Sequence, residues 1–583
     1  MKIKKSSSIY ILLFSIMIFA GACKKDMLNQ NPLNRISDAT FWNNSNDLKL
    51  YCNNFYQLLP NPGAYGNNAN YYIDNNSDNL CPTTRNMRLN GENVVPASGG
   101  GWAYSDWQQI RNVNYFFANY QKVNAAPAEI ATYIGEAYFF RAWFYFDKLK
   151  NYGALPWVNT PLDPADKDAL LAGRLPRNVV ADSIVADLDR AISLLKPKAS
   201  AAAMRINKEI AQAFKTRVCL YEGTWEKYHN GTAFGVEGRD GSAFLQKAAE
   251  EAEALMQSES VGLDNVGAED GYGELFNQVD YSSSKEVLFW RKYQIGVLTT
   301  YWNRYSNSGG GTGMSKDLVE SFLCTDGKPV SVSPLYEGDA TLADVVKNRD
   351  PRLKQILYTP GDLVTTNTSD RIDIFFTTPG FTLAIDQRNT TGYQLQKGNN
   401  TDAAQIDYTT RGLIYIRFGE VLLNFAEAKA ELGTLTQADA DKSINLLRER
   451  VGMPPMVIAA ITTDPDWAFT DLSPVINEVR RERRVELSCE GFRFDDIMRW
   501  AAADELIKGY KYKGAKWAQW DGEFPTLVPG VNIFLDAEGN IEPFQQDQLL
   551  ANGFQFDVNR DYLLPLPVDQ LTLNPALGQN PGW

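Results

Sequence analysis

Histidine is almost absent from this chain, because His229 is the single one among 583 residues. Zinc sites of the H-E-x-x-H type and two-histidine iron sites are therefore excluded, and a Ser-His-Asp triad would have to use His229. The G-x-S-x-G sequence that presents such a serine is missing as well. His229 follows a predicted helix, where a solvated imidazole facing the carboxyl end of the helix is the favoured interpretation.

Cysteine is also scarce, and none of it has the spacing of a metal or redox site. Apart from Cys23, the sequence has an odd number of cysteines and no C-x-x-C pair, so a disulfide framework is excluded. Two of the others, Cys219 and Cys489, fall in predicted helices, where we expect small buried apolar side chains.

Two further stretches resemble cofactor or metal loops but lack the required residues. The glycine run at 309–313 is followed by Met-Ser-Lys instead of Lys-Ser or Lys-Thr, so a flexible loop is favoured over a phosphate-binding loop. The acidic stretch at 536–542 lacks the spacing of a calcium-binding loop. The sequence therefore predicts no cofactor and no metal site.

Positive charge is in deficit, with 57 Lys and Arg against 70 Asp and Glu and a formal net charge of −13. No basic stripe interleaved with aromatic residues is present. Because nucleic acids and polyanionic substrates both need a local positive field, this composition argues against either as a partner. A neutral ligand fits better.

Long hydrophobic runs are missing, and the longest apolar stretch, at 9–20, is too short to span a bilayer. Lysines precede it and small residues lead into Cys23, which together predict a lipoprotein signal peptide at 1–22 and acyl chains on Cys23. Several acyl chains on one residue give firm membrane anchoring. The residues at 24–26, Lys-Lys-Asp, resemble the lysine-acid export signal of surface lipoproteins with one acid missing.

Linkers are missing too, since no Pro/Gly/Ser-rich spacer divides the chain, and we expect one compact unit with subdomains. Helical periodicity predicts helices at 38–59, 106–122, 129–152, 179–195, 207–228 and 241–257. The helix at 129–152 has too many aromatic residues for one stripe and is expected to be buried nearly all round. A short strand follows at 286–290, and 291–411 is rich in loops. The fold class is therefore mostly α.

Three more helices are predicted between 411 and 500. The first ends at Gly433, the second begins with the capping box of Thr436 and Asp439, and the third begins with Ser473 as N-cap. The third helix is densely charged. Its glutamates could be catalytic acids or bases, but the favoured interpretation is an ion-pair network. In that network Glu482, Glu486 and Glu490 pair with arginines of the same region, namely Arg480, Arg483, Arg484 and Arg493.

Four separated strings from this region and from the carboxyl terminus resemble the SusD/RagB family of surface nutrient-binding lipoproteins. They are FGEVLLNFAEAKAELG, INLLRERVGMP, VRRERRVELSCEGFRFDDIMRW and YLLPLPVDQLTLNPALGQNPGW. The strings EAYFFRAWFYFDKLKNYG and AQAFKTRVCLYEG extend the resemblance into the amino-terminal half. The resemblance implies an amino-terminal part at 23–260 and a carboxy-terminal part at 261–583. The two parts are expected to pack as one unit.

The resemblance implies a scaffold of tetratricopeptide-like helical hairpins and a loop-rich, few-stranded ligand-binding subdomain. It also implies a non-enzymatic protein, lipid-anchored in the outer membrane and facing the cell surface. Such a protein captures an oligosaccharide for import through a SusC-like TonB-dependent transporter. Peptide capture by the same kind of complex is an alternative that the sequence leaves open.

Aromatic residues make up 12% of the chain, and several lie in polar loops, where their rings could stack on the C–H faces of sugars. The candidate ligand contacts lie where the resemblance places the family's pocket, and for each ring a core position is the competing interpretation. They are Asp78, Arg85, Trp102, Tyr301, Trp302 and Tyr305. Asp78 and Arg85 could bind pairs of hydroxyl groups. The rival class is a helical glycoside hydrolase, an enzyme that uses a pair of carboxyl groups. With 70 acidic residues, any fold brings some carboxyl groups that close together, so the sequence alone does not exclude this class.

Overall fold

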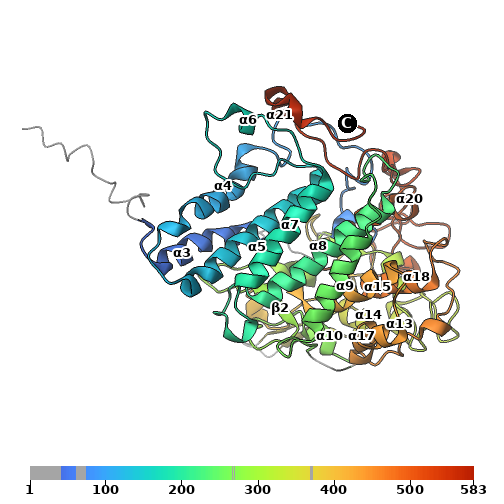
Figure 1. Cartoon of the computed structure of the whole chain (residues 1–583). Helices are drawn as coiled ribbons and strands as arrows, with labels where there is room; N and C mark the ends of the chain where they lie inside the picture. Colours follow the sequence, from blue (N-terminus) through green and yellow to red (C-terminus); the bar gives the residue numbers. More distant parts are fainter. Residues whose placement is uncertain (1–40, 61–73, 265–266, 268, 368–371) are drawn as a thin grey trace, which may run out of the picture.

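The computed structural model describes residues 41–60, 74–264, 267, 269–367 and 372–583 (Figure 1). The predicted signal peptide and Cys23 lie outside these residues. Helices dominate, and the strands form only small two-stranded sheets, so the mostly α fold class is confirmed. No helix in the described part of the chain is both long and apolar enough to cross a membrane.

The amino-terminal helices begin and end close to their predicted bounds, with one exception. The expected first helix is shorter: it starts at Ser45, where Asn44 and Asp47 form a capping box, and continues from Asn53 as a 3-10 segment. The helices are α3 (Ser45–Cys52), α4 (Tyr104–Asn119), α5 (Pro127–Tyr152), α6 (Lys167–Leu170), α7 (Arg177–Leu194), α8 (Lys208–Tyr228) and α9 (Ser242–Met256).

The carboxy-terminal part has shorter helices between long loops. The capping box at Thr436 and the N-cap at Ser473 are confirmed. The helices are α10 (Gly271–Glu274), α11 (Trp302–Ser308), α12 (Lys316–Ser321), α13 (Leu342–Val346), α14 (Pro351–Ile356), α15 (Phe418–Glu431), α16 (Gln437–Asp441), α17 (Ile444–Arg450), α18 (Pro474–Glu486), α19 (Arg493–Arg499), α20 (Ala503–Leu506) and α21 (Val568–Leu573).

The short strands of the described residues pair antiparallel in twos: β1 with β3, β2 with β6 and β4 with β5. Their bounds are β1 (Leu80–Pro82), β2 (Val287–Arg291), β3 (Thr312–Met314), β4 (Leu363–Asn367), β5 (Ile372–Phe375) and β6 (Leu413–Arg417). In the β2–β6 pair Arg291 lies opposite Leu413. This pairing brings the predicted strand at 286–290 to the start of α15.

The long helices pack in sequence, α5 on α7, α7 on α8, α8 on α9 and α9 on α15, and Figure 1 shows them side by side. Such stacking is consistent with tetratricopeptide-like hairpins. Close approach of α8 and α9 needs Gly223, because a Cβ there would lie 2.8 Å from the Leu245 side chain. One apolar core contains side chains from both sides of residue 260, from Trp42 to Leu577. The boundary between the two predicted parts stays a prediction.

Helix α5 is less buried along one edge than the sequence predicts. Most of its aromatic side chains are buried, but Trp143 is half-buried and Asp147 is exposed. Because these two residues are four apart, they lie on the same face of the helix. This face is open to the cavity described below.

The ion-pair network at α18 is confirmed, but its predicted partners are wrong. Glu486 contacts Arg352, Arg417 and Arg450 from three other elements, and burial raises its pKa while these guanidinium groups lower it well below the ordinary value. Glu482 and Glu486 are four residues apart on α18 and therefore face the same neighbouring elements. The arginines next to them on α18 point toward other elements. Other pairs of this network are Glu482 with Arg352 and Arg448, Glu490 with Lys397 and Arg417, Arg480 with Glu431, Arg483 with Asp496, and Arg484 and Arg493 with Asp78.

Two single-residue predictions are also corrected. His229 does follow α8, but it is buried and stacks on Trp225 at a centroid distance of 4.0 Å, so it is not solvated. Burial lowers its pKa to about 3 and keeps the imidazole neutral. Cys489 is buried as expected but lies in the turn after α18 at φ 59°, outside any helix.

Candidate functional site

Asp78, one of the predicted ligand contacts, is buried and already engaged in ion pairs. Arg493 donates to both of its oxygens at 2.7 and 2.8 Å, and Arg484 lies 3.0 Å away. Burial raises the pKa of Asp78, but these two guanidinium groups lower it to about 2. The geometry therefore favours a structural role, in which Asp78 ties the segment before β1 to α18 and α19.

Arg85 is likewise occupied. Its guanidinium group donates to Glu92 at 2.7 Å and to Asp547 at 2.8 Å, so it links its own loop to the carboxy-terminal part. The remaining predicted contacts are rings in the core: Trp302 and Tyr305 of α11 are 3% and 5% exposed, and Tyr301 packs against the same apolar cluster.

Trp102 lies at the predicted junction between loop and helix, since α4 begins at Tyr104. Its ring is 5% exposed and makes edge contacts with Trp107 and Tyr152 at centroid distances of 5.0 and 4.9 Å. Gly101 allows this turn, with φ +79° and no room for a Cβ beside the Tyr152 hydroxyl. Trp102 and Asp78 line two different cavities. Ligand contact by the six residues chosen from the sequence stays a prediction.

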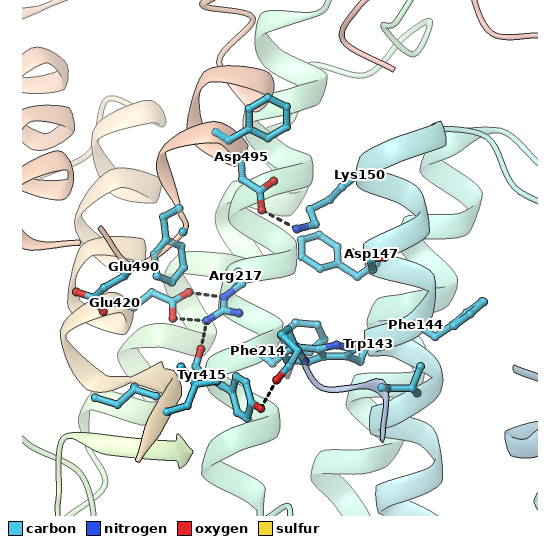
Figure 2. Close-up of a pocket in the computed structure, with 18 of the residues that line it drawn as sticks. Trp143, Phe144, Asp147, Lys150, Phe214, Arg217, Tyr415, Glu420, Glu490 and Asp495 are labelled. Carbon is cyan, nitrogen blue, oxygen red and sulfur yellow. Dashed lines mark hydrogen bonds and ion pairs between the residues drawn. The ribbon is translucent and has the colours of Figure 1, made fainter. Parts of the chain in front are cut away.

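A cavity that the sequence analysis missed has the strongest combination of aromatic and polar side chains (Figure 2). It has a volume of about 540 Å³ and lies between α5, α8, β6, the start of α15 and the turn before α19. We call it the scaffold cavity. Its aromatic lining residues are Trp143, Phe144, Phe146, Phe214, Phe276, Tyr415, Phe492 and Phe494.

An aromatic pair forms one wall of the scaffold cavity. Trp143 of α5 stacks on Phe214 of α8, with centroids 4.7 Å apart and planes inclined by 26°. Phe214 covers one face of the indole, and Trp143 keeps part of its surface exposed. Asp147, one turn further along α5, is exposed beside it and makes no ion pair with a described residue. This wall is therefore a flat apolar surface next to a free carboxylate.

Paired charged groups lie beside this aromatic pair, as Figure 2 shows. Arg217 donates to both oxygens of Glu420, at 2.6 and 2.7 Å, and to the Tyr415 carbonyl at 2.8 Å. Lys150 and Asp495 form a second pair at 2.7 Å. Bidentate contacts of this kind hold side chains in one geometry. The polar groups are therefore oriented before any ligand arrives.

One carboxylate that lines the scaffold cavity, Glu490, does not fit the role of a catalytic acid. A glycosidase needs one carboxyl group whose pKa is raised, so that it can donate a proton near neutral pH. Burial raises the pKa of Glu490, but Arg417 and Lys397 lower it below its ordinary value, and so this carboxylate stays ionised. No cluster of metal-ligating side chains was found among the described residues.

Comparisons with known proteins agree with the resemblance. Residues 274–583 match the SusD family, and residues 28–220 match a family described as starch-binding, associating with outer membrane. A similar relative is SusD-like protein P2 from Formosa agariphila, 24% identical over 95% of this chain and 96% of its own.

Solved structures share the fold. A SusD-like carbohydrate-binding protein from Bacteroides fragilis has a TM-score of 0.69 at 22% identity, over 92% of this chain and 100% of its own. A laminarin-binding SusD-like protein has a TM-score of 0.56 at 18% identity, over 93% of this chain and 100% of its own. Because a single family matches more than half of the sequence, this chain belongs to the SusD family.

Proposed function

We propose that this protein captures an oligosaccharide in the scaffold cavity and delivers it to a SusC-like TonB-dependent transporter in the outer membrane. The observation that best supports this proposal is the half-buried Trp143 ring, which stacks on Phe214 beside oriented polar pairs. One SusD-like protein of similar fold is a carbohydrate-binding protein, and another binds laminarin. We propose further that acyl chains on Cys23 anchor the protein and that it faces the cell surface.

The lining of the cavity suits a sugar in three respects. The C–H face of a pyranose can cover the free face of the Trp143 indole. Arg217 is partly exposed and its guanidinium group is held in one orientation by the buried Glu420, so its remaining N–H donors suit a sugar hydroxyl group. The volume lies within the range of roughly 300–1,000 Å³ typical of small-molecule sites. Neutral oligosaccharides are the expected ligands, because most lining charges are already paired.

Two other functions remain as rivals, and one screen separates all three. We would incubate the protein with a glycan array, a peptide pool and a panel of oligosaccharide substrates, in the native form and as Trp143→Ala. Glycan binding that depends on Trp143 supports the proposal. Peptide binding that depends on Trp143 would support the peptide alternative instead. Turnover that disappears on replacing a carboxylate would establish a glycoside hydrolase.

A further inference from the structure

The turn that connects α18 to α19, residues 487–492, forms part of the wall of the scaffold cavity, and we call it the α18–α19 turn. Glu490, Gly491 and Phe492 of this turn line the cavity. The Arg217 guanidinium group lies over the Phe492 ring, with its carbon 5.0 Å from the ring centroid. The turn therefore places Glu490 and Phe492 in the cavity and supports Arg217 through the Phe492 ring.

The backbone of the α18–α19 turn is strained. Cys489 has a φ of 59°, in the left-handed region that residues with a Cβ rarely adopt. Gly491, two residues on, has a φ of 86°, which glycine tolerates. A strained conformation persists where contacts from the surrounding structure hold it. The turn therefore depends on a partner outside itself.

Asp74 is that partner. Its carboxylate accepts the backbone N–H of Cys489 at 2.8 Å on one oxygen and that of Gly491 at 3.2 Å on the other. The side-chain amide of Asn79 donates to the first of these oxygens at 3.2 Å. Asp74 is 0% exposed and precedes Cys489 by 415 residues, so only the folded chain brings the two together. One buried carboxylate thus holds both backbone amides at the strained positions.

The charge of Asp74 is stabilised less than that of Asp78. The donors to Asp74 are neutral amides, whereas Asp78 is bound by two guanidinium groups. Burial raises the pKa of the Asp74 carboxyl group to about 6. Hydrogen bonds from Asn79 and Cys489 and the charge of Lys397 lower this pKa, and the charge of Asp78 adds to the rise. Asp74 therefore changes charge in a pH range where most carboxylates stay ionised.

The other titratable groups around Asp74 keep one charge state between about pH 5 and 7.5. Burial raises the pKa of the Cys489 thiol well above its ordinary value, so the thiol stays neutral. Lys397 donates to the ionised Glu490 carboxylate at 2.8 Å and stays charged. Arg493, whose guanidinium group also acts on Asp74, is charged throughout this range. A change of the turn within this range therefore follows Asp74.

We propose that Asp74 is a positioning residue of the scaffold cavity, and that its protonation loosens the α18–α19 turn and weakens ligand binding. The ionised carboxylate has an acceptor for each of the two amides. Protonation removes the charge and converts one oxygen into a donor, so the hydrogen bonds to the turn weaken. The consequence for binding rests on the function proposed for the scaffold cavity.

Hydrogen exchange followed by mass spectrometry tests the turn without any ligand. The Cys489 and Gly491 amides should be protected at pH 7.5 and, after correction for the intrinsic exchange rate, lose protection at pH 5. Asp74→Asn cannot ionise and turns an amide donor toward the turn, so protection should be lost at both pH values. The matched control is Asp561→Asn, because Asp561 is also buried and accepts a backbone N–H, that of Asp557 at 2.9 Å, but does not line the cavity. Equal protection in native and Asp74→Asn protein at pH 7.5 would overturn the proposal.

Calorimetric titration with two neutral probes, maltohexaose and laminarihexaose, tests the consequence for binding. If only the ionised form binds and its pKa is about 6, native affinity at pH 5 should be about tenfold weaker than at pH 7.5. Asp74→Asn should bind weakly and to the same extent at both pH values. Unchanged affinity in that variant at pH 7.5, or native binding that does not depend on pH, would overturn the proposal.

Two further variants separate the turn from the rest of the site. Asn79→Ala serves where Asp74→Asn does not fold: it removes a donor to the ionised carboxylate and should raise the pH at which Gly491 loses protection. An unmoved midpoint would overturn the proposal. Trp143→Ala should lose affinity at both pH values and keep the protection of Gly491. If neither probe binds at pH 7.5, the proposed function fails for these ligands, and the exchange experiment still decides whether Asp74 holds the turn.

Discussion

Replacement of Trp143 by alanine is the most direct test of the scaffold cavity. Phe214 already covers one face of the indole, so a bound sugar can bury only the other. Burial of that face is worth about 1 kcal/mol of transfer free energy. The aromatic contact itself adds about 0.5–1.5 kcal/mol. We therefore expect Trp143→Ala to lose about 2 kcal/mol of binding free energy, roughly a thirtyfold increase in Kd.

The assay is calorimetric titration with the best oligosaccharide from the glycan array, together with a melting curve of each variant. Trp143→Phe keeps a ring and should lose less affinity than Trp143→Ala. The matched control is Trp157→Ala, because Trp157 is also half-buried and packs against an α5 ring, Tyr145, with centroids 4.2 Å apart, but does not line this cavity. An unchanged Kd in folded Trp143→Ala would refute the reasoning, as would an equal loss in the Trp157 variant.

Four other predictions concern the anchor, the partner and the residues chosen from the sequence. Cys23→Ala should abolish palmitate labelling, and unchanged labelling would remove the basis for the lipid anchor. A large barrel protein should co-purify from mildly solubilised outer membranes, and its absence would count against a transporter complex. Asp78→Asn should cost about 2 kcal/mol of stability in urea unfolding at pH 7. The pKa of Asp78 in the folded protein is depressed from its ordinary value of 3.8 to about 2, so this contribution is present above pH 3.8 and is lost as the pH falls toward 2. A variant with the same acid sensitivity as the native protein would contradict the prediction. Trp102→Ala should lower stability by about 3–5 kcal/mol with little effect on binding in the scaffold cavity, whereas a large loss of affinity at unchanged melting temperature would restore its ligand role.

Local signals in the sequence were sufficient for the long helices, but not for the short helices α10 to α14 and α19 to α21. Thr436 with Asp439, and Ser473 with Pro474, satisfy backbone groups within their own first turn, so the helix starts could be read without any tertiary information. The aromatic-rich stretch of α5 was correctly recognised as mostly buried. The first helix was predicted too long, because the apolar periodicity continues through a segment that the structure winds as a 3-10 helix.

Partners of charged residues could not be read in the same way. Arg352, Arg417 and Arg450 are far from Glu486 in sequence, and only the packing of α14, β6 and α17 against α18 brings them to its carboxylate. The residues beside Glu486 on its own helix were the obvious candidates but face other elements. The same reasoning explains why Trp143 was missed: nothing local distinguishes it from the core rings around it, and its open edge exists only because α5, α8 and β6 converge.

The ion-pair network and the scaffold cavity share residues. Arg417 and Glu490 line the cavity, and each is also bound on its far side, Arg417 by Glu286 and Glu486 and Glu490 by Lys397. A buried ion pair contributes little net stability compared with apolar residues of similar size. It does hold its members in one orientation, and a binding site needs its polar groups oriented by a supporting layer of contacts. Glu486 of α18 therefore supports Arg417 from behind the cavity, whereas the other charged side chains of α18 tie it to neighbouring elements.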